Sequence, residues 1–219
     1  MTPGWPRKVS SSGASVAGEQ HDPSSGITSG FLLTGNTHVL IPEMSSVTGL
    51  TQDAKYVVGA LGGDTANIRV WAAQTKVLTK VGLGKWPSIS ANGVNGSSTP
   101  VVVGTGYLPS NTGSSAYRWM NGTITELGNF AGGDYSGANA VSADGGTVVG
   151  VAGTNTQQVA FIWTDANKMR SLVDELRARG LEIPVDMSLK FANLISDDGK
   201  TIIGSELTDP PTFWRIVLQ

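Results

Sequence analysis

Apolar and polar residues alternate along this chain in short runs, and each run ends in a cluster of turn-forming residues. The clearest run is Ala138–Gly150, which reads ANAVSADGGTVVG: an alternating stretch enters a Ser-x-Asp-Gly turn and a β-branched stretch leaves it. Period-two alternation predicts half-buried β-strands. The turn glycine supplies a positive φ and the Asp side chain bonds the local backbone. An aromatic strand, Ala160–Thr164, and a further strand ending near Leu172 follow. One such unit therefore predicts two hairpins, or four strands.

This unit recurs five times. Near the C-terminus Ala192–Gly204 repeats it, and in the third copy Ser90-Ala91-Asn92-Gly93 is interpreted as the turn, with Val94–Ser98 inserted after it. A marker glycine follows the β-branched stretch of every copy, at spacings of 41, 45, 46 and 54 residues: Gly18, Gly59, Gly104, Gly150 and Gly204. The aromatic strand carries a tryptophan in four copies and Leu33 in the first: Trp71, Trp119, Trp163 and Trp214.

Repeats of this length are typical of the four-stranded blades of propellers. The sequence thus predicts an all-β fold, a single five-bladed β-propeller of antiparallel blades with about 44 residues per repeat. The whole chain, 1–219, is interpreted as one domain with repeats at about 6–45, 46–84, 85–133, 134–187 and 188–219. A four-stranded sheet cannot bury both faces by itself, so the repeat tryptophans are expected between neighbouring blades.

Two departures from the repeat are informative. Residues 171–180 predict a short amphipathic helix, with Leu172, Val173 and Leu176 on one face and Gly180 as the C-cap. The fifth copy has residues for only three strands, which gives nineteen strands where five full blades need twenty. The two prolines of Met1–Pro6 make that segment a poor strand to fill the gap. We therefore expect one three-stranded blade where the termini meet, with an edge to which a neighbouring subunit can add a strand.

The pattern A-x-A-V-S-A-D-G-x-x-V-V-G, followed by A-F-x-W-T and M-x-x-L, resembles the bacterial repeat called HAF, after its His-Ala-Phe tripeptide. Residues 138–172 match closely, 191–214 look like the last copy of such an array, 46–133 match moderately and 9–45 match in outline. Val159 stands where the family has its histidine. The resemblance implies a propeller-like, extracellular or surface-associated protein, and the family carries no accepted catalytic residues.

Composition narrows the function. Charged residues make up 15% of the chain, the net charge is −2, and the 15 lysines and arginines never cluster, so nucleic-acid binding is not expected. Absence of cysteine excludes disulfides, thiolate zinc sites and thiol catalysis. No apolar run is long enough for a membrane span, and the N-terminus lacks the apolar stretch of a signal peptide. We expect an extracellular or virion location.

Candidate chemistry is sparse. His21 and His38 lie in the weakest repeat without a nucleophile motif, and no G-x-S-x-G elbow is present. Four residues invite a calcium hypothesis, but they lack dense D-x-D-x-D spacing and turn formation accounts for them: Asn92, Asp144, Asp197 and Asp198. We expect no metal and no cofactor. Trp5 and Trp86 lie outside the repeat pattern and are the candidates for exposed aromatic binding surfaces.

Three functions remain open at this point. The first is a non-enzymatic structural or protein-interaction propeller, whose partners are subunits of an extracellular or virion assembly such as a phage tail or decoration structure. The second is a lectin-like glycan binder that uses Trp5 or Trp86. The third is a hydrolase with an unrecognised site in the central channel. The segments that vary most between copies, and are expected at a binding face, follow the marker glycines: 19–29, 60–66, 105–115, 151–158 and 205–212.

Overall fold

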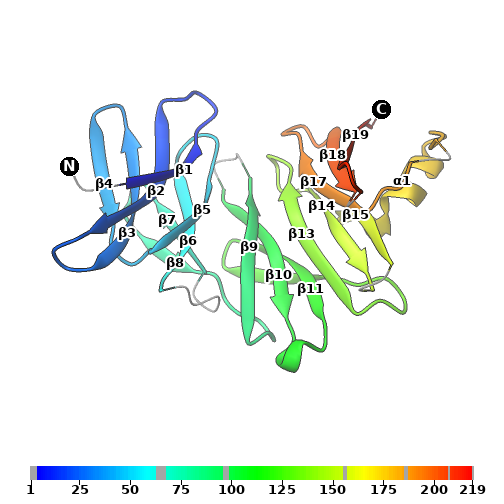
Figure 1. Ribbon diagram of the computed structural model, residues 1–219, viewed down its shortest axis with the longest axis horizontal. Helices are drawn as coiled ribbons and strands as arrows, with labels where there is room; N and C mark the ends of the chain where they lie inside the picture. The colour runs from blue at the N-terminus through cyan, green and yellow to red at the C-terminus, as the bar shows by residue number, and fades with distance from the viewer. Residues whose placement is uncertain are drawn as a thin grey trace.

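The computed structural model describes residues 4–62, 68–95, 99–154, 157–184, 187–206 and 208–218. Within these residues nineteen strands form five antiparallel sheets, each made of consecutive strands (Figure 1). The first sheet contains β1 (Gly4–Val9), β2 (Ser15–Asp22), β3 (Ile27–Thr34) and β4 (Thr37–Ile41); the second contains β5 (Ser46–Leu50), β6 (Tyr56–Ala60), β7 (Ile68–Ala72) and β8 (Leu78–Lys80).

The third sheet contains β9 (Ser88–Val94), β10 (Val101–Tyr107), β11 (Ser114–Met120) and β12 (Thr123–Gly128); the fourth contains β13 (Tyr135–Val141), β14 (Thr147–Gly153), β15 (Gln158–Thr164) and β16 (Lys168–Ser171). The fifth has only β17 (Phe191–Ile195), β18 (Thr201–Glu206) and β19 (Thr212–Val217). The predicted hairpins and the three-stranded last sheet are confirmed. A short 3₁₀ turn (Pro109–Asn111) lies between β10 and β11 of the third sheet, and α1 (Leu172–Ala178) lies between the fourth and fifth sheets.

The predicted helix is confirmed with its cap. Ser171 accepts a hydrogen bond from the Asp174 N–H through its side chain, and Leu172 and Leu176 are buried. Gly180 ends the segment with φ 71°. Glu175 is also buried, where it pairs with Arg170 and Arg179, because a buried carboxylate must be compensated by charge.

The five sheets follow one another along an arc. Figure 1 shows the first sheet and the N-terminus at one end of the longest axis, and β17–β19 with the C-terminus at the other. Each hydrophobic cluster of the described residues joins two sheets that are adjacent in sequence, and none joins the first sheet to the fifth. The expectation that the termini meet at a ring junction is therefore wrong for this structure.

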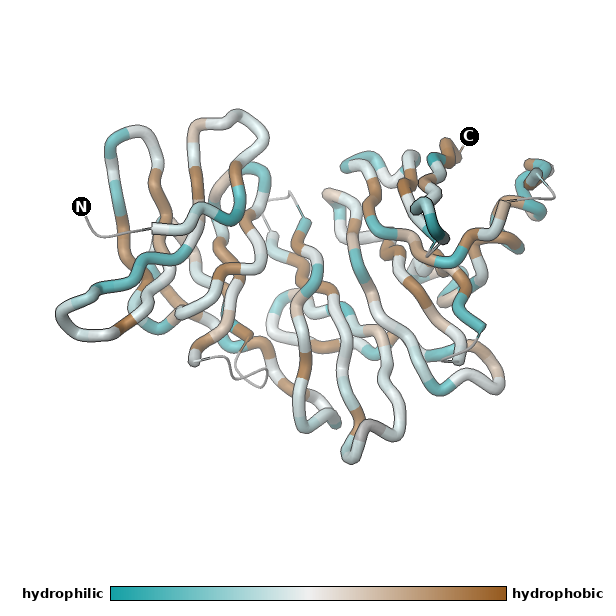
Figure 2. Tube along the Cα trace, viewed as in Figure 1, coloured by the Kyte–Doolittle hydropathy of each residue, from teal (hydrophilic) through white to brown (hydrophobic). Residues whose placement is uncertain are grey.

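Four clusters supply the core, one at each junction between adjacent sheets. In Figure 2 most of the brown, hydrophobic segments lie along the strands, while many of the turns are white or teal. Each of the four repeat tryptophans is buried in a different cluster, as predicted: Trp71, Trp119, Trp163 and Trp214. Burial of such a side chain between two sheets contributes about 2–3 kcal/mol. A single sheet cannot gain this stabilisation by itself, because it cannot bury both of its faces.

The marker glycines are explained by a β-bulge. In every sheet the first strand carries one extra residue, and the marker glycine pairs beside it: the bulged residues are Arg7, Thr48, Asn92, Asn139 and Asn193. A Cβ added to Gly104 would overlap the Ser90 carbonyl oxygen, and one added to Gly150 would overlap that of Gly137. The marker glycine is thus required by a close approach of two backbones, and none of the five has a positive φ.

Strand register corrects one assignment in the fifth copy. Trp71, Trp119 and Trp163 lie two residues beyond the residue that pairs with the marker glycine. Trp214 pairs directly with Gly204, and Ile216 holds the tryptophan position. The assignment of Trp214 to the repeat tryptophan is therefore two residues out of step. Because two residues keep the same face of a strand, Trp214 is buried all the same.

The turn of the third copy was also misplaced. Residues 88–94 form one continuous strand, and Asn92 is the bulged residue instead of a turn residue. Asn95 closes the hairpin: its N–H donates to the Val101 carbonyl, and its side-chain oxygen accepts from the Val101 N–H. Ser142 does the same with Thr147 in the fourth copy. The third and fourth copies therefore align through Asn92 and Asn139, which lie in a shared A-N-x-V-[SN] motif. Residues 96–98 lie outside the described part of the chain.

Candidate interaction site

The outer edge of the last sheet has no fourth strand. The Leu218 N–H donates to the Lys200 carbonyl, which sets which residues of this segment face the preceding strand. In an antiparallel ladder the backbone groups of alternate residues point to opposite sides. Those of Phe213, Arg215 and Val217 therefore point away from β18. In the other four sheets β4, β8, β12 or β16 pairs along this edge.

The residue at the start of this edge shows the difference between the sheets. In the first four sheets the backbone of the residue at this position forms a hydrogen bond on the outward side. For example, the Gly30 N–H donates to the Met44 carbonyl and the Ala160 N–H donates to the Leu189 carbonyl. Phe213 holds this position in β19, and no outward partner occurs among the described residues. The edge thus presents unsatisfied backbone donors and acceptors to solvent.

A small pocket adjoins this edge. It has a volume of about 230 Å³ and is lined by Met187, Glu206, Thr208, Thr212, Phe213 and Trp214. Phe213 is 72% exposed. An added strand gains affinity from main-chain hydrogen bonds and specificity from pockets for its side chains, and this edge offers both. Phe213 was not among the residues predicted from the sequence to bind a partner. The same position in three other copies holds a smaller residue: Gly30, Ala116 and Ala160.

A second cavity lies on the axis around which the sheets are arranged. Its volume is about 220 Å³ and all five first strands or their turns contribute to its lining, which includes Lys8, Gln52, Asn92, Asn139, Leu194 and Asp197. Asp197 is the one carboxylate among the lining residues, and they include no histidine. It accepts a hydrogen bond from the Gln52 side-chain amide at 2.5 Å. The pair of carboxylates or the nucleophile–base pair that hydrolysis requires is not assembled by these residues.

The two histidines lie apart from any acidic partner that the structure describes. The Nδ1 atom of His21 lies 3.2 Å from the Thr28 hydroxyl oxygen, and the His38 ring packs against Phe31 with 5.3 Å between ring centroids. Both contacts lie within the first sheet, where His21 is half-buried and His38 is exposed.

The acidic turn residues bond their own turns. The Asp144 carboxylate accepts from the Ser142 hydroxyl at 2.5 Å and the Gly146 N–H at 2.9 Å, and these bonds lower its pKa. The Ser196 hydroxyl and the Lys200 N–H lower the pKa of Asp198 in the same way. No group of three or more His, Cys, Asp and Glu side chains suited to a metal occurs in the part of the chain that the structure describes.

The two tryptophans outside the repeat pattern have different fates. Trp5 is 48% exposed on β1, as expected. Trp86 is 3% exposed, so its prediction as an exposed surface is wrong. It packs between the second and third sheets, 6.0 Å from the Tyr117 ring, and a Cβ on Gly106 would overlap its indole. Gly106, two residues after the marker glycine, was the signal in the sequence for a buried aromatic ring.

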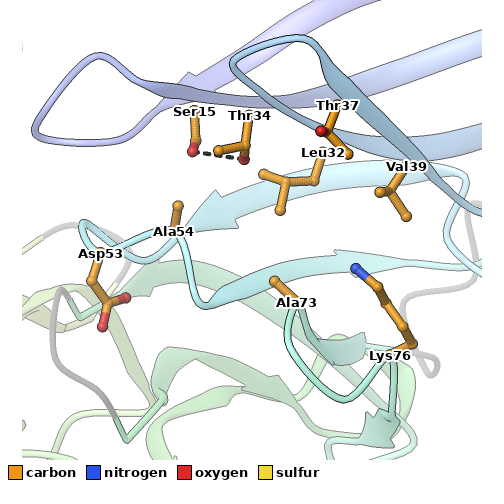
Figure 3. A pocket seen from close by; sticks show the side chains of 9 residues that line it. All are labelled: Ser15, Leu32, Thr34, Thr37, Val39, Asp53, Ala54, Ala73 and Lys76. Atoms are coloured by element: carbon orange, nitrogen blue, oxygen red, sulfur yellow. Dashed lines mark hydrogen bonds between the residues drawn. The ribbon is translucent and has the colours of Figure 1, made fainter.

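The structure also reveals a groove that the sequence did not indicate. It lies between the first two sheets, has a volume of about 370 Å³, and is lined by the nine residues labelled in Figure 3. Leu32 lies near its middle, whereas Asp53 and Lys76 lie at opposite ends (Figure 3). Ser15 and Thr34, both on the wall formed by the first sheet, bond each other at 2.8 Å. The hydroxyl groups of Ser15 and Thr34 therefore already have one hydrogen-bond partner each.

The segments predicted to vary at a binding face are partly strand. Glu19–Asp22 belongs to β2 and Ile27–Ser29 to β3, which leaves a turn of four residues between them. Residues 63–66, 155–156 and 207, which fall in three of the other segments, lie outside the described residues. Within the described residues, no helix is long and apolar enough to cross a membrane.

Comparison with known proteins identifies the fold. The chain matches no known family model and no curated protein. It is similar to the crystal structure of TolB from Acinetobacter baumannii, with a TM-score of 0.58 and 12% identity over 99% of this chain and 52% of that one. It is also similar to the β-propeller domain of the trilobed protease from Pyrococcus furiosus, reported to have an open velcro topology (TM-score 0.60, 14% identity, 96% and 67% covered).

A third similar structure is that of a prolyl endopeptidase, with a TM-score of 0.62 and 11% identity over 97% of this chain and 34% of that one. The chain thus spans about half of TolB and a third of the endopeptidase. At these identities the likeness shows a β-propeller fold and no more.

Proposed function

We propose that this chain is a non-catalytic propeller module that binds partner proteins, and that an extended partner segment adds to the open edge of β19. The observation that carries the proposal is the missing fourth strand of the last sheet, beside the exposed Phe213 and its pocket. An unpaired edge is a template for another strand, and natural proteins that do not use such an edge blunt it with charge, proline or a bulge. On β19 the one charged residue, Arg215, lies between Phe213 and Val217.

The axial cavity favours a binding role over hydrolysis. Its lining residues include one carboxylate and neither histidine nor cysteine, and Asn92 and Asn139 there are engaged in bonds between blades. This chain covers 34% and 38% of two peptidase structures that resemble it, so the similarity concerns a part of each. We therefore propose a protein that is not an enzyme.

We further propose that the five sheets act as the five blades of a propeller built into an extracellular or virion assembly, such as a phage tail or decoration structure. The resemblance to HAF repeats supports a surface setting, and the low charge of the chain suits hydrogen-bonded contacts. The genes beside the coding sequence test this setting: capsid and tail genes support the virion form, and their absence from every related locus overturns it.

Strand addition can be tested with the chain's own fourth strands as probes. A fluorescent peptide of residues 121–130, which contains β12 (Thr123–Gly128), should bind the protein and raise its fluorescence anisotropy. Alternate N-methylation of the peptide should abolish binding, because it removes main-chain donors without changing side chains. Arg215→Pro should abolish binding too, since it deletes an outward N–H, whereas Arg215→Ala should retain it. Binding that survives N-methylation, or no binding to the native protein, overturns the proposal.

The glycan-binding alternative now has Trp5 as its one exposed candidate, because Trp86 is buried. A glycan array separates the two functions. Binding of a sugar that is lost in Trp5→Ala, together with no effect of Arg215→Pro, would replace protein binding by glycan binding.

A further inference from the structure

Both ends of the arc present uncovered apolar faces. On the fifth sheet one face of β17–β19 exposes Leu194, Ile203, Phe213 and Val217, and we name it the trailing face. On the first sheet the face of β1–β4 directed away from the second sheet exposes Val9 and Leu40, with Val16 and Leu33 partly buried beside them; we name it the leading face. Exposed contiguous apolar surface of this kind marks interaction sites.

In every other sheet the trailing face is covered by the next sheet. Val58, Val103 and Val149 hold the same position as Ile203, directly before the marker glycine, and all three are at most 1% exposed. Ile203 itself is 40% exposed. The same surface that forms the core at four junctions within the chain is therefore bare at the fifth sheet.

The bulged asparagines add a polar bond to two of these junctions, the one between the third and fourth sheets and the one between the fourth and fifth. The Asn92 amide donates to Thr105 of its own sheet at 3.4 Å and to the Ala138 carbonyl of the next sheet at 2.9 Å. Asn139 likewise donates to the Ala192 carbonyl at 3.0 Å. Asn193 keeps the bond within its own sheet, to Ser205 at 2.8 Å. Among the described residues, no carbonyl of a further sheet accepts from the Asn193 amide in the way that the Ala138 and Ala192 carbonyls accept from Asn92 and Asn139.

An arginine repeats the same comparison. Arg118, on the trailing face of the third sheet, lies 4.9 Å from the centre of the Trp163 ring and donates to the Gly145 carbonyl of the next sheet at 3.1 Å. Arg215 holds the same register position in the fifth sheet, since both residues directly follow the partner of the marker glycine. It is exposed, and no bond or ion pair of its side chain occurs among the described residues. The apolar surface of the fifth sheet, Asn193 and Arg215 thus all lack the contacts that a next sheet would provide.

We propose that a second copy of this chain covers the trailing face, with its first sheet placed as each sheet is placed on the one before it. The copy supplies the leading face, which is the surface that sheets two to five use at the four internal junctions. By register, Asn193 then donates to the carbonyl of Pro6, the residue before the bulge, and Arg215 to that of Gly13 in the first hairpin turn. Such a head-to-tail contact is heterologous, so it propagates until a ring closes or a filament forms.

A complementation experiment tests this contact. The trailing variant carries Leu194→Asp and Ile203→Asp, and the leading variant carries Val9→Asp and Leu40→Asp; all four side chains are at least 40% exposed. By light scattering after size exclusion, the native chain should gain mass with concentration above 22.7 kDa. Each variant alone should remain a monomer, because each has lost one of the two faces. An equimolar mixture should give a dimer and nothing larger, since one intact face of each kind remains.

Controls keep the result interpretable. Val77→Asp, which changes a 56% exposed valine outside both faces, should associate like the native chain. Asn193→Ala and Arg215→Ala leave the apolar surface intact and should each weaken association about tenfold; they serve if the aspartate variants lose their circular dichroism spectrum. A native chain that stays monomeric at all concentrations, or a mixture that stays monomeric, overturns the proposal. The outcome is independent of strand addition, because the peptide assay reads the edge of β19 and can succeed or fail in the monomer.

Discussion

The marker glycines provide the sharpest test of the fold. In Gly150→Ala the new Cβ would overlap the Gly137 carbonyl oxygen, and it would lie 2.7 Å from Phe161 Cε1 and 3.0 Å from Ala138 Cα. Carbon atoms in contact prefer about 3.5–4.0 Å. Two of the three neighbours are backbone atoms, which cannot rotate away as a side chain can. The strand pair at the bulge must therefore separate or lose its register.

The size of the effect follows from this geometry. Overpacking of a core typically costs about 1–3 kcal/mol, and because backbone is displaced we expect about 3 kcal/mol for Gly150→Ala. For a chain of this length 1 kcal/mol corresponds to about 2–4 °C, so the melting temperature should fall by about 6–12 °C. Gly82→Ala is the matched control, since its Cβ meets nothing within 4 Å and its φ is not positive. It should be neutral or stabilised by up to about 1 kcal/mol.

Thermal and guanidinium unfolding, followed by circular dichroism, would measure both variants against the native chain. The guanidinium midpoint should fall in Gly150→Ala with an unchanged slope, because the unfolded state exposes the same surface. If Gly150→Ala melts within one or two degrees of Gly82→Ala, the close approach at the bulge does not explain the repeat glycine.

Three further outcomes are expected. Trp163→Ala should cost about 3–5 kcal/mol in guanidinium unfolding, because the side chain is buried and lies beside Arg118, whereas Trp5→Ala, half exposed, should cost less than about 1 kcal/mol; equal losses would contradict the packing between blades. Burial raises the pKa of Tyr117, whose hydroxyl donates to the Ser90 carbonyl. The stabilisation from the neutral hydroxyl is therefore fully present below the unfolded pKa of about 10 and is lost as pH rises above it. Tyr117→Phe should unfold with a flatter alkaline profile, and an identical profile would refute this source. EDTA should leave the melting temperature unchanged, since the turn carboxylates are bonded by hydroxyl and N–H groups; a clear drop would reveal a metal that these turns hold.

Local pattern was sufficient for what lies within one repeat. Alternation and Ser-x-Asp-Gly turns predicted the hairpins because both act between residues close in sequence: Gly145 and Gly199 have φ 74° and 71°, as such turns require. The capped helix after Ser171 and the three-stranded last sheet were predictable for the same reason. The burial of the repeat tryptophans followed from the need of each sheet to cover a face.

What lies between repeats was decided by the tertiary structure. Trp86 is buried because Gly106, twenty residues away, leaves room for its indole, and no periodicity in the chain expresses that pairing. The step of two residues at Trp214 preserves the face of the strand, so hydrophobicity could not reveal it. The open arc is the largest difference. Whether five sheets close depends on the small rotation between neighbours, which side-chain packing at four junctions sets, and local sequence signals do not report that rotation.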